Sequence, residues 1–460
     1  MKPLSLTLAA EYARGRVARG TEQNILGVST DSRAVKKGDL FIALIGENHD
    51  GPDHVAAAVR AGAVAVMAQK TVEVPAGIIH VRDTLEGLQR LAGAYRRSLL
   101  VRVVGVTGSS GKSSTKEMIA SVLSRRFRTH KTLGNFNNHI GVPLTLLSLE
   151  PDHEWVVVEV GMNHPGEIKP LADLMQPEIG VVTNVDWTHA WAFEDQQAIA
   201  DEKGAMLRAL PALGISIINA DDKKVREMVE TSRARSVLVG QGADWVYGFE
   251  NVQCCDEFVE FDLHTRKEKT RVKLSTPAPH MAQNAVLAAA VGGELGLSAK
   301  EIAEGLSATQ FPPSRCALRR FGKGWLIDDT YNASPGPVMA GFDTLQALSG
   351  SGRSVVILGA MGELGSHSRR LHEKVGEAAA EKGVQLLFAL GEDARCMVEA
   401  AQKRGLNEQQ SRWFKSHEEL AEAYVKVARP DDKILIKGSR SQHMEKIVQM
   451  LEGGATCSSI

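Results

Sequence analysis

The sequence predicts an α/β protein of three domains. Its 460 residues are too many for one ordinary hydrophobic core, because domains commonly hold about 100–200 residues. Short apolar runs alternate with helical segments, and many of the 43 glycines directly follow such a run. This alternation indicates parallel sheets covered by helices. We expect domains over residues 1–97, 98–312 and 313–460.

The composition argues against several classes of function. The 54 basic and 55 acidic residues nearly cancel, and only 5% of the residues are aromatic, which suits neither a nucleic-acid binder nor a protein that docks on anionic membranes. Five cysteines without a CxxC pair indicate neither a zinc module nor a disulfide framework. No apolar run of about 20 residues is present to span a membrane. We therefore expect a cytoplasmic protein.

The first domain is predicted from short buried runs and the helices between them. Residues 39–44 and 78–81 read as strands, and residues 63–67 as an extended segment. Helices are predicted over residues 54–61 and 85–97.

The second domain begins with β-branched residues at 101–106, which favour a strand. A helix is expected from about Lys112 to Leu123, and strict apolar–polar alternation at 258–263 indicates antiparallel strands. An alanine-rich helix follows at 280–295. Further strands are predicted at residues 155–160, 179–183 and 215–218.

The third domain starts near Pro312-Pro313, where we expect a hinge. The α/β rhythm then resumes. Its strands are predicted at residues 325–327, 355–358, 386–390 and 434–436, and the last three are closely followed by Gly359, Gly391 and Gly438.

The strongest chemical signal is the turn that follows the strand at 101–106. Backbone N–H groups of such a turn and of the helix after it converge on one point and can hold a phosphate chain. Lys112 would reach the terminal phosphates, and Ser113 would place its hydroxyl on Mg²⁺. Val106 stands where the pattern GxxxxGK[ST] requires glycine, so the match is the shorter TGxxGKS. The alternative is an ordinary glycine-rich turn.

Glu159 lies near the end of the predicted strand at 155–160, and His189 follows the next predicted strand along the chain, at the edge where open parallel sheets bind ligands. A carboxylate in an apolar strand is costly without a partner, so Glu159 is a candidate metal ligand. Its alternative is a salt-bridged acid at a strand end, and that of His189 is a structural histidine. Lys203 lies on a predicted helix, where lysines are usually solvated.

Two further polar segments are candidates for substrate binding. Asn135, Asn137 and Asn138 lie between glycines, which suits a turn as well as it suits contacts to a polar substrate. At strand ends of the third domain, Asp329 could hold ribose hydroxyls and the basic loop from Lys437 could hold a carboxylate. Arg315, just past the hinge, could reach a phosphate when the domains close.

Together, these motifs resemble the Mur ligases. The matching segments are residues 104–116, 134–147, 183–203, 328–335 and 437–441, and residues 29–33 with 38–41 are similar to the UDP-binding domain of that family. GNFNNHIGVPLTLL and DDTYNASP look like the members that join D-alanyl-D-alanine to UDP-muramoyl-tripeptide, and the DNPR segment of a sister ligase is absent. The resemblance implies an N-terminal UDP-binding α/β domain, a central P-loop-type parallel sheet with flanking helices, and a C-terminal Rossmann-like α/β domain.

The resemblance also implies roles for individual residues. Catalysis would depend on Lys112, Glu159, His189 and Lys203, the last being carbamylated in related ligases. The residues expected to bind ATP are Thr107, Gly108, Ser109, Ser110, Gly111, Lys112, Ser113, Asn284, Arg315 and Asp329. The Mg²⁺ ligands would be Ser113, Glu159, His189 and Lys203. The UDP-bearing substrate would contact Asp31, Ser32, Arg33, Asn137 and Asn138. Departures from the family pattern occur at Pro52, Met281, Ser334 and Ala360.

The implied activity is an ATP-dependent amide ligation in a monomer. A carboxylate does not react with an amine until its oxygen becomes a good leaving group, so the γ-phosphoryl group of ATP would first form an acyl phosphate. The alternatives are another Mur-type or polyglutamate ligase, or a regulatory protein that binds nucleotide without ligation.

Overall fold

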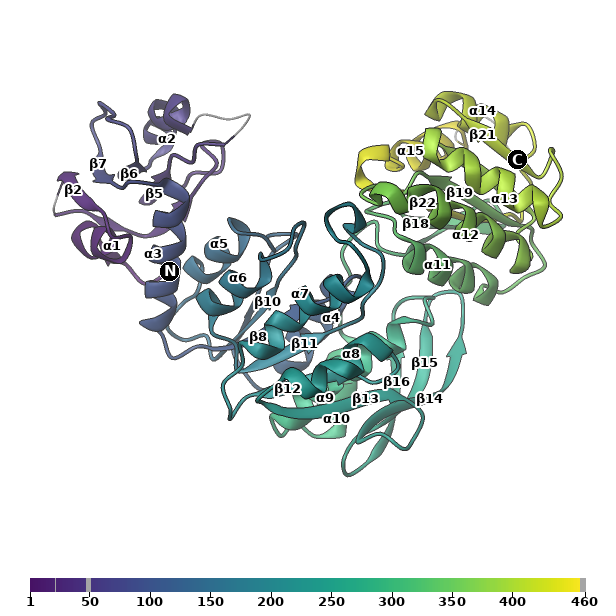
Figure 1. Ribbon diagram of the computed structural model, residues 1–460, viewed down its shortest axis with the longest axis horizontal. Coiled ribbons are helices and arrows are strands. Elements are labelled where there is room, and N and C mark those ends of the chain that lie inside the picture. Colours follow the sequence, from purple (N-terminus) through teal and green to yellow (C-terminus); the bar gives the residue numbers. More distant parts are fainter. Residues whose placement is uncertain (21, 47–50, 456–460) are drawn as a thin grey trace.

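The computed structural model describes residues 1–20, 22–46 and 51–455, which fold around three main sheets. Figure 1 shows the N-terminal and C-terminal parts on opposite sides of the central part. The predicted α/β class and its mostly parallel sheets are confirmed.

The N-terminal sheet has the strand order β2-β7-β6-β5-β4, in which only β2 runs antiparallel to its neighbour. A two-stranded β1-β3 ribbon lies beside it. The elements are β1 (Leu4–Ser5), α1 (Leu6–Tyr12), β2 (Arg16–Arg19), β3 (Asn24–Ile25), β4 (Gly27–Ser29), β5 (Asp39–Ile42), α2 (Val55–Ala61), β6 (Ala65–Ala68), β7 (Gly77–His80) and α3 (Thr84–Arg97).

The central sheet has nine strands in the order β16-β15-β14-β13-β12-β11-β8-β10-β9. Each neighbouring pair in the series β10-β8-β11-β12-β13-β14 is parallel. Beyond it, β15 pairs antiparallel with β14 and with β16, as the alternation at 258–263 predicted. The strands are β8 (Arg102–Thr107), β9 (Thr129–Lys131), β10 (Trp155–Glu159), β11 (Ile179–Val182), β12 (Ile215–Asn219), β13 (Arg235–Gln241), β14 (Tyr247–Cys254), β15 (Val259–His264) and β16 (Lys269–Leu274). The helices are α4 (Lys112–Leu123), α5 (Gly141–Leu147), α6 (Ile168–Met175), α7 (Gln196–Arg208), α8 (Lys223–Glu227), α9 (Met281–Glu294) and α10 (Ala299–Ser307).

The C-terminal sheet has the order β17-β18-β22-β19-β20-β21, parallel except for β17. Its elements are β17 (Ala317–Phe321), β18 (Gly324–Asp329), α11 (Pro335–Ala347), β19 (Ser354–Gly359), α12 (Ser368–Glu381), β20 (Leu386–Leu390), α13 (Arg395–Lys403), β21 (Ser411–Phe414), α14 (His417–Val425), β22 (Lys433–Lys437) and α15 (Glu445–Ala455).

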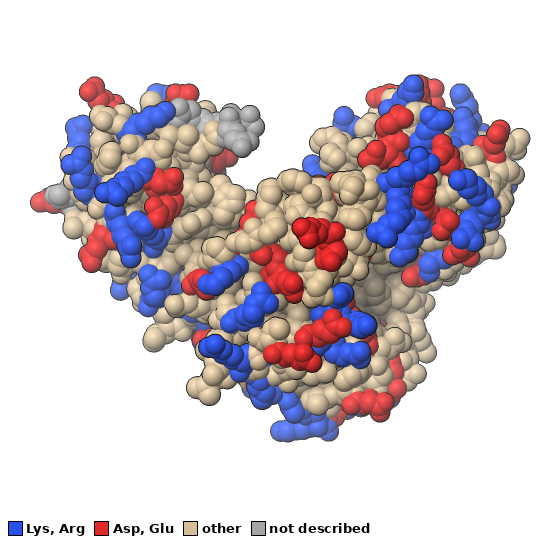
Figure 2. Space-filling view, viewed as in Figure 1, with Lys and Arg blue, Asp and Glu red and all other residues tan. Residues whose placement is uncertain are grey.

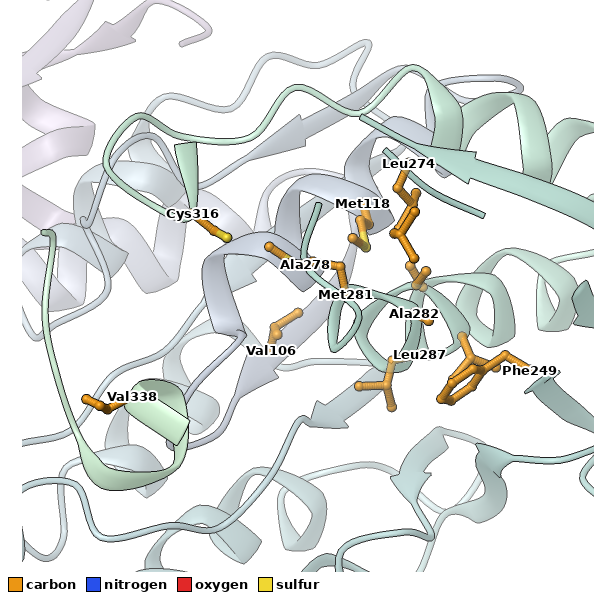
Figure 3. Close-up of a cluster of buried hydrophobic side chains, with 14 of the residues drawn as sticks. Val106, Met118, Phe249, Leu274, Ala278, Met281, Ala282, Leu287, Cys316 and Val338 are labelled. Carbon is orange, nitrogen blue, oxygen red and sulfur yellow. The ribbon is translucent and has the colours of Figure 1, made fainter. Parts of the chain in front are cut away.

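A buried apolar cluster anchors the helix that follows the glycine-rich turn. Figure 3 shows Val106 of β8 and Met118 of α4 close to Met281 of α9. The same cluster continues into the C-terminal part, where it includes Cys316 and Val338. Each fully buried side chain of this size contributes about 1.5–3 kcal/mol, so the start of α4 is firmly held.

The opposite face of the central sheet packs toward the N-terminal part. One buried cluster joins Leu91 and Tyr95 of α3 to Val156 of β10 and Leu146 of α5. The Tyr95 hydroxyl also donates a hydrogen bond of 2.8 Å to the Leu149 carbonyl. The central part therefore shares a core with each of its neighbours.

The surface shows no strong segregation of charge on the face in Figure 2, where basic and acidic side chains are interspersed over all three parts. Among the described residues, no helix is both long and apolar enough to cross a membrane.

Candidate active site

The glycine-rich turn connects β8 to α4 at the carboxyl edge of the parallel strands. Gly108 and Gly111 have φ angles of 148° and 76°, which L side chains rarely adopt. A Cβ at Gly108 would overlap the Thr183 hydroxyl, and one at Gly111 would lie 2.7 Å from Asn284 Oδ1. Both glycines are therefore required for the close approach of this turn to its neighbours.

Lys112 folds back over the turn. Its Nζ donates hydrogen bonds to the carbonyls of Gly108 and Ser109, at 2.8 and 3.2 Å. Burial lowers the pKa of this ammonium group, and the charge of Arg315 adds to that effect. A desolvated cation beside a glycine-rich turn that leads into a helix N-terminus favours a polyphosphate.

Glu159 ends β10 with an exposure of only 1%. Its two carboxylate oxygens accept hydrogen bonds of 2.8 Å from the Ser113 hydroxyl and from Asn137 Nδ2. Its backbone N–H donates to Thr132 Oγ1 at 3.0 Å. The structure thus brings Ser113 and Glu159 together, as their positions after parallel strands predicted.

Lys116 is part of this cluster, although the sequence did not single it out as a site residue. Its Nζ lies 3.7 Å from Glu159 Oε2 and 3.2 Å from Glu117 Oε1, and the side chain is fully buried. The signal that could have found it is its spacing of three residues from Ser113, which places both on one face of α4.

Lys203 is 1% exposed on α7, and its Nζ lies 3.8 Å from the Met162 sulfur. Burial holds the pKa of this amine well below its ordinary range, and the charge of Lys112 lowers the pKa further. The structure therefore places a buried lysine amine, whose pKa is lowered, within electrostatic reach of Lys112 in the glycine-rich turn.

His189 follows β11 at the same sheet edge, but its ring points to the C-terminal part. Its Nδ1 lies 2.7 Å from Glu363 Oε2, and this contact is the main cause that lowers the pKa of the Glu363 carboxyl group. The Trp191 N–H also donates to the Glu363 carbonyl, at 3.1 Å. The contact of the His189 ring in this arrangement is thus with Glu363 of the C-terminal part.

The candidate nucleotide contacts of the C-terminal part also lie near this edge. The Arg315 guanidinium stacks 4.0 Å from the centre of the Tyr331 ring. Asp329 Oδ2 pairs with Lys437 Nζ, and Asp329 Oδ1 accepts from the Cys316 N–H at 3.1 Å. The charge of Arg315 acts on the Lys112 ammonium, so these two cations lie within electrostatic reach of each other.

The candidate UDP contacts fall into two places. Asp31, next to Ser32 in the turn after β4, binds Arg33 through two hydrogen bonds of 2.9 and 2.8 Å, and this contact lowers the pKa of Asp31 to about 2. Asn138 instead lies in the central part, where its Oδ1 accepts from the N–H groups of Ile140 and Gly141 at the start of α5.

The chain is similar to Mur ligases over most of its length. Three family models match: "Mur ligase family, catalytic domain" at residues 24–96, "Mur ligase middle domain" at 106–292, and "Mur ligase, glutamate ligase domain" at 314–440.

Individual relatives are similar across the full chain. The UDP-N-acetylmuramoyl-tripeptide–D-alanyl-D-alanine ligase of Bacillus subtilis is 34% identical over 96% of this chain and 97% of its own. A crystal structure of MurF from Acinetobacter baumannii has a TM-score of 0.91 at 29% identity, covering 98% of this chain and 99% of that one. The MurF ligase of Thermotoga maritima in complex with ADP has a TM-score of 0.83 at 26% identity, covering 94% and 98%.

Proposed function

The chain belongs to the Mur ligase family, and we propose that it is the ATP-dependent ligase that joins D-alanyl-D-alanine to UDP-N-acetylmuramoyl-tripeptide. The observation that carries this proposal is the meeting of Lys112, Ser113 and the buried Glu159 at one sheet edge, within a chain similar to such ligases from end to end. The membership and the three-domain fold that the sequence predicted are confirmed.

The residues near Glu159 fit a magnesium ion. The Ser113 hydroxyl and the Glu159 carboxylate are hard oxygen donors 2.8 Å apart, and Mg²⁺ prefers such ligands. When bound, the ion would offset the negative charge of the phosphates. We also propose His189 and Lys203 as ligands of this ion. His189 would first have to leave Glu363, with which it pairs in this structure.

A carbamate on Lys203 is consistent with its surroundings. A neutral amine can attack carbon dioxide, forming an N–C bond and losing one proton, whereas a protonated amine cannot. Burial lowers the pKa of Lys203 and so shifts it toward the reactive form. The product would carry anionic oxygens within electrostatic reach of Lys112.

The reaction would use the chain to bind, orient and exclude water. The glycine-rich turn and the start of α4 would hold the triphosphate, with Lys112 exchanging its carbonyl partners for phosphate oxygens. The γ-phosphoryl group would pass to the terminal carboxylate of the tripeptide, giving an acyl phosphate and ADP. The dipeptide amine would then attack the acyl carbon, lose a proton and expel phosphate.

The other assignments belong to the same proposal. Asn284, Arg315 and Asp329 would contact the nucleotide, and Asp31, Ser32, Arg33, Asn137 and Asn138 the UDP-bearing substrate. We keep the domain limits 1–97, 98–312 and 313–460, which fall just after α3 ends at Arg97 and just before β17 begins at Ala317. We also propose a cytoplasmic monomer.

The test is a coupled ADP-release assay with UDP-muramoyl-tripeptide, run with and without D-alanyl-D-alanine. We expect ADP release to require the dipeptide, and single amino acids to replace it poorly. ADP release that needs a single amino acid or glutamate would favour another Mur-type or polyglutamate ligase. Nucleotide binding without any acceptor-dependent ADP release would favour a regulatory protein.

A further inference from the structure

The segment that follows β11 contacts both the phosphate loop and the C-terminal part. On its first side, the Asn184 carbonyl and side-chain oxygen accept hydrogen bonds of 2.9 Å from the N–H groups of Ser109 and Ser110. The backbone of Asp186 exchanges two hydrogen bonds with the Ser109 hydroxyl, at 2.8 and 3.0 Å. A phosphate that moves Ser109 or Ser110 would therefore move residues 184–186 with them.

On its second side, the Asp186 side chain reaches helix α11 of the C-terminal part. Its Oδ2 accepts a hydrogen bond of 2.8 Å from the Gly336 N–H, while its Oδ1 accepts one of 2.7 Å from the Trp187 N–H. A Cβ on Gly336 would overlap Asp186 Oδ2. The fit at this contact leaves no space for a side chain at residue 336.

The first turn of α11 depends on this contact because of its sequence. The first turn of a helix has N–H groups without partners in the helix, which a capping side chain normally satisfies. Ser334 at the N-cap makes no such side-chain bond, and Pro335 and Pro337 have no N–H. Gly336 therefore has the one N–H among the first three helical residues, and its acceptor comes from the central part.

The residues after Asp186 also contact the C-terminal part. The Trp187 ring lies 4.5 Å from the His367 ring and 5.3 Å from the Arg370 guanidinium. Gly365 packs against Trp191, and His189 pairs with Glu363. The segment 184–191 thus connects the phosphate loop on one side with α11 and the loop before α12 on the other.

We propose that Asp186 is a positioning residue for the ligation: it transmits the state of the phosphate loop to the C-terminal part by capping α11. The inference rests on the proposed function, because the C-terminal part must be correctly placed for nucleophilic attack on a protected acyl phosphate. Asp186 itself contacts no reacting atom in this scheme.

The test is Asp186→Asn, compared with Asp173→Asn as a control. The D186N side chain could accept with only one oxygen, and its NH₂ group would oppose one of the two N–H donors, while the backbone bonds to Ser109 remain. Asp173 pairs with Lys169 on the surface, so D173N changes the charge equally without touching α11. We expect D186N to lower kcat about tenfold to a hundredfold, the range for a lost hydrogen bond to a charged group. The KM for ATP should stay close to the wild-type value, and the thermal midpoint, although lowered by the lost cap, should stay well above the assay temperature.

A double-mutant cycle tests the contact from its other side. Gly336→Ala should lower kcat on its own, because the new methyl group collides with the carboxylate. In the Asp186→Ala background, which removes that carboxylate, G336A should add little further loss. G336A also keeps the inference testable if D186N fails to fold.

The outcomes separate this inference from the proposed function. A wild-type enzyme without dipeptide-dependent ADP release would overturn the function itself. A normal wild-type enzyme, with D186N within about twofold of its kcat or with independent losses in the cycle, would overturn only the role of Asp186. A drop in thermal midpoint that accounts for the lost activity would reduce Asp186 to a structural residue.

Discussion

The two halves of the candidate active site are built differently. Around Glu159, the partners Ser113, Asn137 and Lys116 all come from the central part, and the carboxylate is almost completely buried. Around His189, the partner is Glu363 from the C-terminal part, whose side chain is 52% exposed. The first half is fixed by the fold of one domain, whereas the second depends on how two domains are placed.

The two halves therefore differ in the free energy needed to break their contacts. Breaking a contact inside the buried half leaves a charge without a partner in a low-dielectric environment, which is costly. Breaking the contact between His189 and Glu363 costs less, because water can solvate the half-exposed Glu363 carboxylate. The buried half around Glu159 can therefore keep its arrangement while the C-terminal part changes its position.

The largest effect should come from the preformed half. Lys112→Ala removes the cation above the phosphate loop, and we expect turnover to fall by about 10²–10³-fold or more, as for the loss of a preorganised transition-state contact. Binding of the UDP-bearing substrate, measured by calorimetry, should persist, since Lys112 is not among its proposed contacts. Lys169→Ala on the exposed face of α6 is the control. Near-normal turnover of K112A would show that the phosphate assignment is wrong.

Glu159→Gln should have the next largest effect. It keeps the shape of the side chain but removes its charge beside Ser113 and Lys116. We expect turnover to fall about tenfold to a hundredfold, in line with a lost charge-assisted contact, and half-saturation to require more Mg²⁺. Glu178→Gln, which affects a surface pair with Arg102, provides the comparison. An unchanged Mg²⁺ dependence in E159Q would remove Glu159 from the metal site.

Glu363→Gln should have a smaller effect, because it breaks a half-exposed pair. Such pairs contribute about 0.2–1 kcal/mol, which limits the change in kcat to about fivefold. The Trp191 N–H, which donates to the Glu363 carbonyl, should exchange its hydrogen faster as the two domains separate more often. Slower hydrogen exchange, or a loss of activity as large as that of E159Q, would show that the contact of His189 is as firmly fixed as the contacts of Glu159.

The smallest effect concerns stability within the central part. Burial lowers the pKa of His130 to about 4, and nearby His153 adds to this effect. Since this pKa lies below the ordinary value of 6.5, protonation favours the unfolded chain, and the resulting loss of stability grows as pH falls from about 6.5 to 4. His130→Gln can keep the hydrogen bond to Ser148. We expect its thermal midpoint to fall less than that of the wild type over this pH range. Parallel pH profiles of the two proteins would contradict the assignment.

The sequence allowed the elements within each domain to be predicted, because their signals are local. Apolar runs marked β8, β10 and β11, and the glycine spacing marked the phosphate loop between β8 and α4. The proximity of Ser113 and Glu159 followed from the parallel arrangement of their strands. These features depend on neighbours in the sequence or on a general property of parallel sheets.

The features that could not be predicted depend on burial or on domain placement. Lys116 looks like an ordinary helix lysine until the structure shows Glu117 and Glu159 beside it in the core. The contacts Asp186–Gly336 and His189–Glu363 join residues far apart in the sequence, and no local pattern specifies how two domains meet. The sequence therefore indicated His189 as a candidate ligand but not its partner.

The first turn of α11 also provides a spectroscopic reporter. Pro335 and Pro337 lack amide protons, so Gly336 is the one residue of these three that gives a signal in a ¹⁵N-correlated spectrum. Since this amide donates to Asp186 across the domain boundary, its chemical shift senses whether that boundary is engaged. A single selectively labelled glycine would thus let an observer follow the enzyme through its catalytic cycle in solution.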